Sequence, residues 1–239
     1  MQKPNGYLIY EGPSMLDGQP IIGVATLASS NIKTGNMAQL WILRADMHPS
    51  EALKTQADAS ICGGCPHRQS LGGACYVTVH RAPAQVWKQY RAGRYPSDWN
   101  PEAFAGRKVR LGAYGDPAAL PVPIIERLVS KARGWTGYTH QARHPNFQKE
   151  LLQWVMVSVD TPRQALKAHS QGLRTFRVRT TDSPLLDGEV VCLSEQGVSC
   201  IECGLCNGQG EGPSIVIDVH GQLANRYVRD FQRINVLQV

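Results

Sequence analysis

Short apolar runs alternate with turn-rich or amphipathic segments along most of the chain, and this pattern predicts its secondary structure. Near the beginning, Tyr7–Tyr10 and Ile21–Leu27 are apolar runs joined by the turn-rich segment GPSMLDGQP. Two strand-like runs around such a segment predict a β-hairpin. The polar loop Ala28–Asn36 and another apolar run, Gln39–Leu43, come next, so we expect a third strand there.

Further along, strand-like runs alternate with segments whose apolar residues recur at helical spacing. The predicted strands are Val109–Ala113, Gly137–His140, Trp154–Val159, Thr175–Val178, Glu189–Cys192 and Ser214–Val219. The predicted helices are Pro49–Thr55, Pro83–Ala92, Pro121–Ala132, Asn146–Leu152 and Pro162–Ser170. Repeated strand–helix units of this length indicate a parallel sheet or a barrel with right-handed crossovers.

These elements predict an α/β protein with a partial (β/α) barrel of the TIM type, made of about six parallel strands. We expect an N-terminal hairpin extension at 1–38, the barrel at 39–221 and a C-terminal tail at 222–239. The barrel would carry two cysteine loops, at 61–76 and at 191–208. A length of 239 residues allows a sizeable core, and 42% hydrophobic residues argue against a disordered chain.

Location and partners follow from what the chain lacks and from its charge. No apolar run reaches the length of a membrane span, and the segment MQKPNGYLIYEG lacks the pattern of an export signal. We therefore expect a cytoplasmic protein without membrane contact. The formal charge of +6 permits a nucleic-acid partner, and the predicted basic patch consists of Arg91, Arg94, Arg107 and Lys108.

Four of the seven cysteines lie within the segment Val191–Gly208, and they are Cys192, Cys200, Cys203 and Cys206. The last three have the spacing C-x2-C-x2-C, which can direct three thiolates onto one iron–sulfur cluster, as in bacterial ferredoxins. Structural zinc more often takes its thiolates from two separate C-x2-C pairs. The spacing favours iron–sulfur over zinc. Disulfides or free thiols are the third alternative, which the odd number of cysteines disfavours.

The other three cysteines, Cys62, Cys65 and Cys75, form a second group. Three thiolates leave one metal position for His67, for water or for a bound ligand. An open position of this kind is where chemistry can take place. The alternative is that His67 completes a structural zinc site of the Cys3His type.

Polar residues follow most of the predicted strands. They are Tyr114–Gly115–Asp116–Pro117, His140–Gln141, Ser158–Asp160, Thr180–Asp182, Cys192 and His220–Gly221. The carboxyl ends of parallel strands meet at one edge of a sheet or barrel, where active sites are assembled, so we expect a site there. Each residue taken alone has a structural alternative as a helix cap or a turn residue.

Two of these segments resemble radical S-adenosylmethionine (SAM) enzymes. The run VRLGAYGDPAALPVPIIERLV is similar to the family's second strand and glycine-rich turn, with Gly115, Asp116 and Pro117 at the matching positions and Asp in place of Glu. The run WVMVSVDTPRQAL resembles the fourth strand, which commonly ends as Ser158–Val159–Asp160 does. A three-cysteine loop upstream and a four-cysteine segment downstream also match the family's plan. The resemblance extends over Gln39–Gly221.

Two features differ from the family pattern. The first cysteine group has the spacing C-x2-C-x9-C rather than C-x3-C-x2-C, and an insertion, His48–Ser60, precedes it. The segments GNMAQLWILRADM and ICGGCPHR also resemble uncharacterised bacteriophage proteins, which would place the chain in a host cytoplasm.

The resemblance implies a function. Cys62, Cys65 and Cys75 would bind a [4Fe–4S] cluster whose fourth iron takes SAM, and the other four cysteines would hold an auxiliary cluster. Gly115, Asp116, Pro117 and Ser158 would bind the cofactor, while Tyr114, His140 and Asp160 would be catalytic candidates. The one-electron reduction of the cluster implies a reductant protein as partner, and the basic charge together with the resemblance to bacteriophage proteins suggests a nucleotide or nucleic-acid substrate.

Two other functions remain open. One is a non-catalytic protein that binds iron–sulfur clusters or zinc and contacts nucleic acid or a partner protein. The other is a zinc-containing base-exchange enzyme with Asp116 or Asp160 as nucleophile. It resembles tRNA-guanine transglycosylases in having a late cysteine cluster followed by a histidine, His220.

Overall fold

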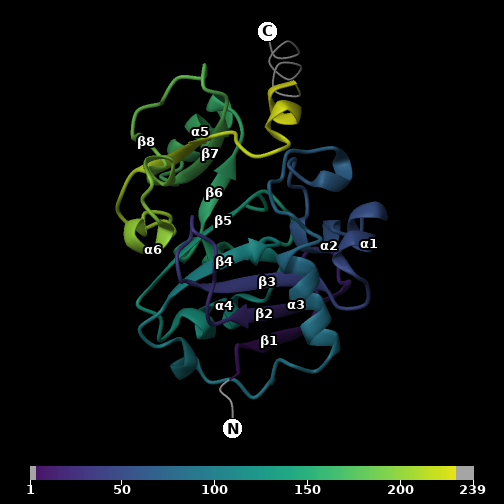
Figure 1. Cartoon of the computed structure of the whole chain (residues 1–239). Coiled ribbons are helices and arrows are strands. Elements are labelled where there is room, and N and C mark those ends of the chain that lie inside the picture. The colour runs from purple at the N-terminus through teal and green to yellow at the C-terminus, as the bar shows by residue number, and fades with distance from the viewer. Residues whose placement is uncertain (1–3, 230–239) are drawn as a thin grey trace.

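The computed structural model describes residues 4–229, which contain one nine-stranded sheet with the order β1-β2-β3-β4-β5-β6-β7-β9-β8. Strands β1 (Gly6–Pro13), β2 (Pro20–Thr26) and β3 (Ala38–Arg44) are antiparallel neighbours. From β3 onward, every neighbouring pair is parallel. The sheet runs from β1, near the N-terminus, to β7 and β8 at the opposite end of the molecule (Figure 1).

The remaining strands are β4 (Lys108–Tyr114), β5 (Gly134–Thr139), β6 (Met156–Val159), β7 (Thr175–Arg179), β8 (Glu189–Val191) and β9 (Ser214–Asp218). Each overlaps a predicted strand, so the prediction of an α/β protein is confirmed. Within the described residues the sheet is open, with β1 and β8 as its edges, and it does not close into a barrel. The last two strands are also exchanged in space, because β9 lies between β7 and β8.

The helices are α1 (Pro49–Lys54), α2 (Ala59–Cys62), α3 (Ala82–Arg91), α4 (Val122–Val129), α5 (Pro162–His169) and α6 (Cys200–Cys203). Their starts follow local chemistry: the Thr161 hydroxyl accepts a hydrogen bond from the Gln164 backbone N–H at the start of α5. No helix among residues 4–229 combines the length and apolar character needed to cross a membrane.

The predicted helix Asn146–Leu152 is wrong in type, because a 3-10 helix, η4 (Lys149–Gln153), occupies most of this segment. The chain before it is held in a turn, since the His144 carbonyl accepts from the Phe147 N–H at 3.0 Å. The Gln148 side chain is then tied to another element, because its Oε1 accepts from the Val122 N–H at 3.1 Å. These contacts keep an α-helix from starting at Asn146.

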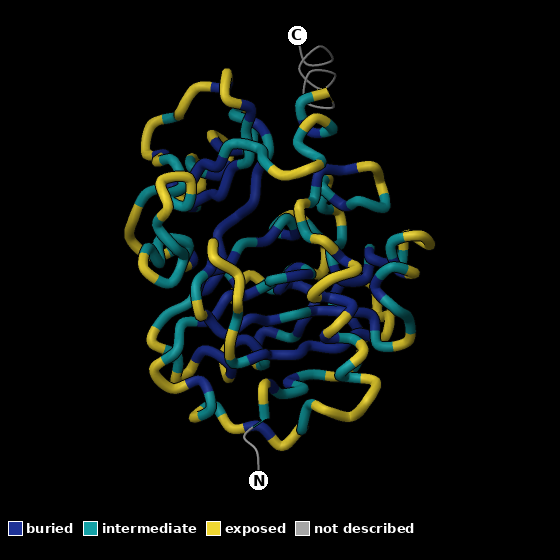
Figure 2. Tube along the Cα trace, in the orientation of Figure 1, coloured by how far each residue is buried: buried dark blue, intermediate teal, exposed yellow. Residues whose placement is uncertain are grey.

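The apolar core is unevenly distributed along the sheet. A large continuous cluster fills the part built on β1–β5, and it includes the fully buried Ile22, Leu40, Ile42, Phe104 and Leu111. The part built on β6–β9 has only small separate apolar clusters among the described residues. Figure 2 shows the same contrast, with the densest buried chain in the strands of the first part.

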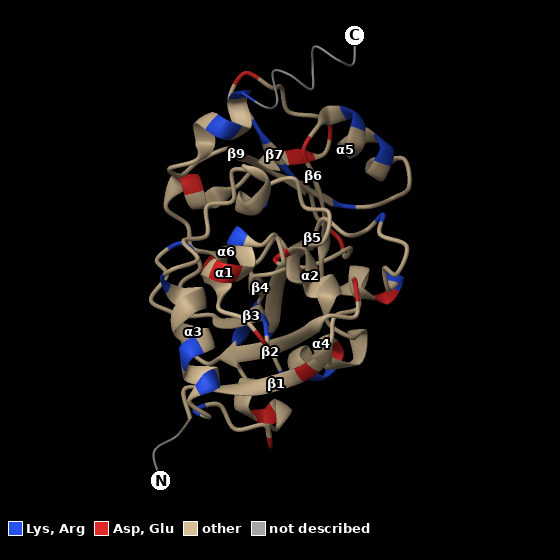
Figure 3. Ribbon diagram, turned by 90° about the vertical axis from the view of Figure 1, so that its right-hand side faces the viewer, with Lys and Arg blue, Asp and Glu red and all other residues tan. Residues whose placement is uncertain are grey.

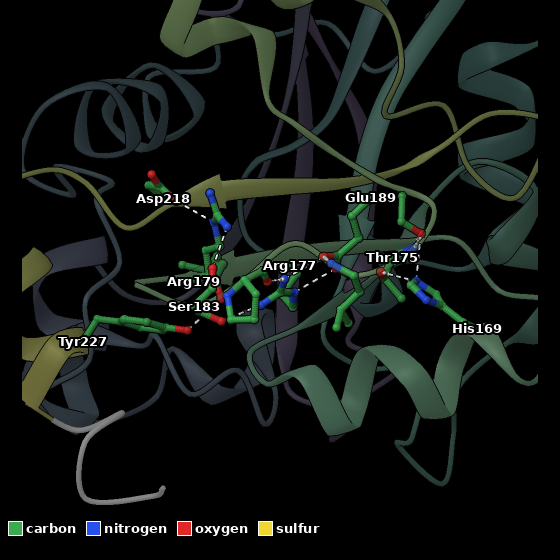
Figure 4. Close-up of polar contacts among 12 residues, drawn as sticks. His169, Thr175, Arg177, Arg179, Ser183, Glu189, Asp218 and Tyr227 are labelled. Carbon is green, nitrogen blue, oxygen red and sulfur yellow. Dashed lines mark hydrogen bonds and ion pairs between the residues drawn. The ribbon is translucent and has the colours of Figure 1, made fainter. Parts of the chain in front are cut away.

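A buried polar network joins the strands of the second part. Arg177, on β7, is fully buried and donates two hydrogen bonds to the Glu189 carboxylate, at 2.7 and 2.6 Å. Arg179 donates from Nε to Oδ1 of Asp218, on β9, at 2.8 Å. Figure 4 shows Arg177 reaching toward Glu189 and Arg179 reaching toward Asp218. In this part of the sheet, ion pairs contribute contacts that apolar side chains supply around β1–β5.

The described part of the predicted tail, residues 222–229, returns to the sheet. The Tyr227 hydroxyl is 2.7 Å from the Val178 carbonyl and 3.1 Å from the Asp160 carbonyl, and it can donate to either. Residues 1–3 and 230–239, which belong to the predicted extension and tail, lie outside the described residues.

Candidate metal centres and ligand cavity

Both cysteine groups face one cavity. Its volume is about 230 Å³, and it lies at the carboxyl ends and along the inner face of the parallel strands. Six of the seven cysteines line it, namely Cys62, Cys65, Cys75, Cys192, Cys200 and Cys206. The fold therefore brings two groups that are far apart in sequence to the wall of one cavity.

The side chain of Gln141, two residues after the end of β5, positions the first cysteine group. Cys62 ends α2, and Gly63 follows it with a φ of 52°. The Gln141 amide donates to the Cys62 carbonyl at 2.8 Å, and its Oε1 accepts from the Gly64 N–H at 3.0 Å. A Cβ on Gly63 would lie 2.2 Å from that Oε1, so only glycine fits here. The Gln141 hydrogen bonds fix the loop between Cys62 and Cys65.

The long spacing before Cys75 is accommodated by a fold-back of the chain. The Gly73 N–H donates to the Arg68 carbonyl at 2.9 Å, and the Cys75 N–H donates to the His67 carbonyl at 2.8 Å. Arg68 and Asp58 form a buried ion pair at 2.7 Å across the base of this loop. These bonds return Cys75 to the other two cysteines.

The pKa values show that the three thiols are close together. Burial raises the pKa of the Cys62 thiol well above its ordinary value, and the neighbouring Cys65 and Cys75 raise it further. Burial also raises the pKa of Cys75 to about 11, with a further contribution from Cys65. A bound cation would favour the thiolate forms of Cys62 and Cys75 and so oppose these rises in pKa.

The second cysteine group surrounds a small cavity of its own. All four thiols, Cys192, Cys200, Cys203 and Cys206, line a space of about 20 Å³. Cys200 and Cys203 lie on α6, which a capping box of Ser199 and Glu202 starts and which ends at Gly204, with a φ of 68°. The positive φ turns the chain so that Cys206 also faces this space.

Arg174 holds the loop that follows Cys206. Its guanidinium donates hydrogen bonds to four backbone carbonyls, those of Leu205, Gly208, Gly210 and Pro213, at 2.8 to 3.3 Å. A buried guanidinium with this many backbone partners fixes the path of the chain, and with it the position of the last cysteine.

A second arginine, Arg110 on β4, lies between the second cysteine group and the larger cavity. It is buried, donates to the Tyr138 hydroxyl and stacks 4.3 Å from the centroid of that ring. No carboxylate of the described residues forms an ion pair with it. Burial raises the pKa of Cys206 to about 12, and Arg110 opposes this rise. Arg110 therefore stabilises the thiolate forms of this group.

The loop after β2 covers the second cysteine group. The Cys200 N–H donates to the Lys33 carbonyl at 2.9 Å, and the Ile201 N–H donates to the Thr34 carbonyl at 3.1 Å. Gly35 approaches so closely that a Cβ there would lie 2.5 Å from Ile201. Figure 1 shows this loop rising from the first strands toward α6.

The turn Gly115–Pro117 at the end of β4, which was predicted to bind the cofactor, is held by hydrogen bonds within the protein. The Asp116 carboxylate accepts from the Ala118 N–H at 3.0 Å, the Thr139 hydroxyl at 2.7 Å and the His140 N–H at 2.9 Å. Burial raises the pKa of Asp116, although these hydrogen bonds oppose the rise. Gly115 packs on Ile42, and Pro117 begins the short 3-10 helix η3 (Pro117–Ala119). Asp116 thus ties β4 to the end of β5.

Two hydroxyls in the cavity wall have no hydrogen-bond partner among the described residues. They belong to Tyr114 and Ser158, and both side chains line the large cavity. Burial raises the pKa of Tyr114 far above its usual range, and nearby Cys62 adds to this. A buried polar group without a partner costs about 1–3 kcal/mol, so these hydroxyls mark where a polar ligand group would be stabilised.

His67, His140 and Asp160 form a compact polar cluster beside the first cysteine group. His67 Nε2 lies 2.6 Å from Asp160 Oδ1, and His140 Nε2 lies 3.6 Å from Asp160 Oδ2. Burial opposes ionisation of Asp160, but the two imidazoles outweigh it and hold its pKa well below its usual range. Burial lowers the pKa of His140, while Cys65 and Asp160 raise it to a larger extent.

The possible ligand atoms of this cluster lie closer together than those of the cysteine groups. His67, His140 and Asp160 bring three such atoms within 4.8 Å of one another. Among residues 4–229, no three of the seven sulfurs come equally close together. The cysteine groups are therefore wider than the histidine–carboxylate cluster.

The remaining polar residues that follow strands divide between the cavity and the surface. His220 lines the cavity and stacks on Tyr76, with ring centroids 5.4 Å apart. Asp182 is exposed, and its pKa is lowered by a hydrogen bond with Thr180. Figure 3 shows Lys and Arg residues on several elements, including α3 and α5.

Several residues that position the site were not predicted from the sequence. They are Gly63, which packs against Gln141, and Arg110, Arg174, Tyr138 and Tyr227. Arg110 had a signal in the sequence, since it stands inside the mostly apolar strand β4. A cation in a strand that is buried on both faces needs a partner inside the fold.

Comparison with protein-family models, with curated proteins and with solved structures found no match to this chain. The resemblance to radical SAM enzymes therefore remains a prediction.

Proposed function

We propose that the chain is an iron–sulfur protein of the radical SAM type, with one cluster open to a substrate cavity and a second, closed cluster beside it. The observation that carries the proposal is that both cysteine groups line the same cavity. Three thiols and an open side suit a cluster that binds a ligand, whereas four thiols around a small space suit a closed one.

The spacing of the cysteines along the chain favours iron–sulfur over zinc. Cys200, Cys203 and Cys206 have the spacing C-x2-C-x2-C, which can direct three thiolates onto one cluster. Structural zinc more often takes its thiolates from two separate C-x2-C pairs.

The residues of the cavity fit such a cofactor. Cys62, Cys65 and Cys75 would hold the open cluster, which with SAM would supply one-electron reductive chemistry. The hydroxyls of Tyr114 and Ser158 would orient a polar group of the ligand, because both lack partners in the described residues. The apolar side chains of Phe176, Val178 and Ile217 line the same space and would exclude water.

At the four-cysteine site, the positive charge of Arg110 would favour binding of an iron–sulfur cluster. Four thiolates around iron leave a net negative charge, and the buried Arg110 offsets it without being neutralised by a carboxylate of the described residues. We further propose a reductant protein as partner, a nucleotide or nucleic-acid substrate, and a reducing compartment such as the cytoplasm, of a host cell if the chain is encoded by a phage. The seven unpaired cysteines support the reducing compartment.

The test is the metal content and the spectroscopy of anaerobically purified protein. We expect about eight irons and eight sulfides per chain, and an electron paramagnetic resonance (EPR) spectrum of the reduced protein that changes when SAM is added. The Cys62→Ser variant should lose the SAM response and keep the second cluster, and Cys203→Ser should do the reverse. Zinc without iron would refute the proposal.

A non-catalytic metalloprotein is the second candidate, and one observation favours it. Both oxygens of Asp116 already accept hydrogen bonds from Ala118, Thr139 and His140, so this carboxylate is not free for the SAM amino group. Two iron–sulfur clusters without a spectral response to SAM would decide for this candidate.

A further inference from the structure

We propose that His67, His140 and Asp160 form a third metal site, which binds one divalent first-row ion such as Fe²⁺, Co²⁺ or Zn²⁺ through two imidazoles and one carboxylate. This site uses no cysteine ligand, although His140 lies against Cys65 of the first cysteine group, and it goes beyond the proposed function. It does not depend on whether the clusters or SAM bind.

The ligand atoms already converge. One nitrogen of each histidine and one oxygen of Asp160 lie within 4.8 Å of one another. Metal–ligand bonds of about 2.0–2.2 Å require neighbouring ligand atoms about 3.0–3.5 Å apart, so only small side-chain movements separate this cluster from a coordination sphere. The three residues come from the first cysteine loop and from the carboxyl ends of β5 and β6, three segments that the fold holds together.

Hydrogen bonding alone leaves this cluster incomplete. The His67–Asp160 contact is short, at 2.6 Å, but His140 Nε2 lies 3.6 Å from the carboxylate, too far for a hydrogen bond. That nitrogen is buried and has no hydrogen-bond partner among the described residues. An ion placed between the two imidazoles and the carboxylate would satisfy it.

Outer contacts hold each ligand in place, as is common around metal sites. The His140 backbone N–H donates to Asp116 at 2.9 Å. The Asp160 N–H donates to Gln164 Oε1 at 2.9 Å. The His67 ring stacks on Tyr227, with centroids 5.4 Å apart. These contacts hold the backbone of His140 and Asp160 and the ring of His67 in place before an ion arrives.

The donor set defines the chemistry of the ion. Two imidazole nitrogens and a carboxylate oxygen are typical of divalent first-row metals, whereas thiolates select softer ions and clusters. Three protein ligands leave positions open, and both imidazoles line the large cavity. The ion would therefore present its open positions to a ligand in that cavity, beside the first cysteine group.

The experiment is a Co²⁺ titration of the full chain, purified anaerobically and with its cysteine sites loaded. We expect one additional Co²⁺ per chain, with d–d absorption and without a sulfur-to-cobalt charge-transfer band. The isosteric variant Asp160→Asn should weaken this binding at least about ten-fold, and so should His140→Ala. Circular dichroism and the metal content of the cysteine sites should stay unchanged and would show that the variants fold.

The matched control is His144→Ala, which removes a histidine outside the cluster and should leave Co²⁺ affinity unchanged. Three results would overturn the proposal: no Co²⁺ beyond the cysteine sites, equal affinity in Asp160→Asn, or a charge-transfer band that assigns the ion to Cys65 and its neighbours. A protein that lacks a SAM response but still binds this Co²⁺ would refute only the proposed function.

Discussion

The two parts of the sheet are stabilised in different ways. Around β1–β5 a single apolar core buries Leu40, Ile42 and Leu111 completely. Around β6–β9 the apolar clusters of the described residues are small, and Arg177 and Glu189 form a fully buried ion pair. The first part can fold on hydrophobic burial, whereas the second depends on polar contacts that tolerate little change.

The second part also contains the four-cysteine group. Arg174 binds the carbonyls of the loop that carries Cys206, and the small cavity inside the group is lined by all four thiols. Bound metal would therefore supply stabilisation to the part of the molecule that has the smaller core. Four predictions test whether the two parts are stabilised differently.

The largest effect is expected when the four-cysteine site loses the proposed metal. A structural thiolate site contributes about 10 kcal/mol or more to folding. In Cys203→Ser, or after chelation, β7–β9 should lose protection from amide hydrogen exchange while β1–β4 keep theirs. Restoring the metal to chelated wild-type protein should restore protection, and equal loss in both parts would contradict the comparison.

The next effect comes from the buried ion pair. In Arg177→Met the Glu189 carboxylate is left buried without its partner, so the free energy of unfolding should fall by about 3–5 kcal/mol. The double variant Arg177→Met/Glu189→Leu should recover part of this loss in urea denaturation.

The control for the ion pair is the exposed contact between Lys131 and Glu102, at 3.4 Å. Because both side chains are more than half exposed, Lys131→Met should change stability by less than about 1 kcal/mol. A similarly small change in the stability of Arg177→Met would show that the buried ion pair does not stabilise the second part of the sheet.

A substitution in the apolar core should lower stability by an amount comparable to, or slightly smaller than, the loss in Arg177→Met. Leu40→Ala removes a fully buried side chain and should lower the free energy of unfolding by about 2–5 kcal/mol. The metal content of folded Leu40→Ala should not change, since Leu40 does not line the cavity. Loss of metal from the folded variant would mean that the two parts are not separately stabilised.

The smallest effect on stability is expected at Tyr114. Its hydroxyl has no partner in the described residues, so Tyr114→Phe should leave stability unchanged or raise it by up to about 1 kcal/mol in ligand-free protein. Thermal unfolding measures this change, and SAM binding should weaken in the same variant. A loss of 2 kcal/mol or more would indicate that the hydroxyl is already satisfied inside the fold.

Local patterns were sufficient to predict the strands, because runs such as Trp154–Val159 are apolar and bounded by turn residues. The meeting of polar residues at one edge also followed from the parallel arrangement. The exchange of β8 and β9 in space could not be predicted, since strand order depends on packing between distant segments. For the same reason the hydrogen bonds of Asp116 were not foreseen: its partners Thr139 and His140 lie on the next strand.

The position of β9 has a consequence for how the chain is assembled during synthesis. Strand β8 is paired only with β9 among the described strands, and β9 follows it after the whole four-cysteine segment. As the chain emerges from the ribosome, all four cysteines are made before β8 has a partner. Strand β8 therefore joins the sheet only after Ser214–Asp218 has been made, so the four-cysteine segment between the two strands is complete before its two ends are brought together.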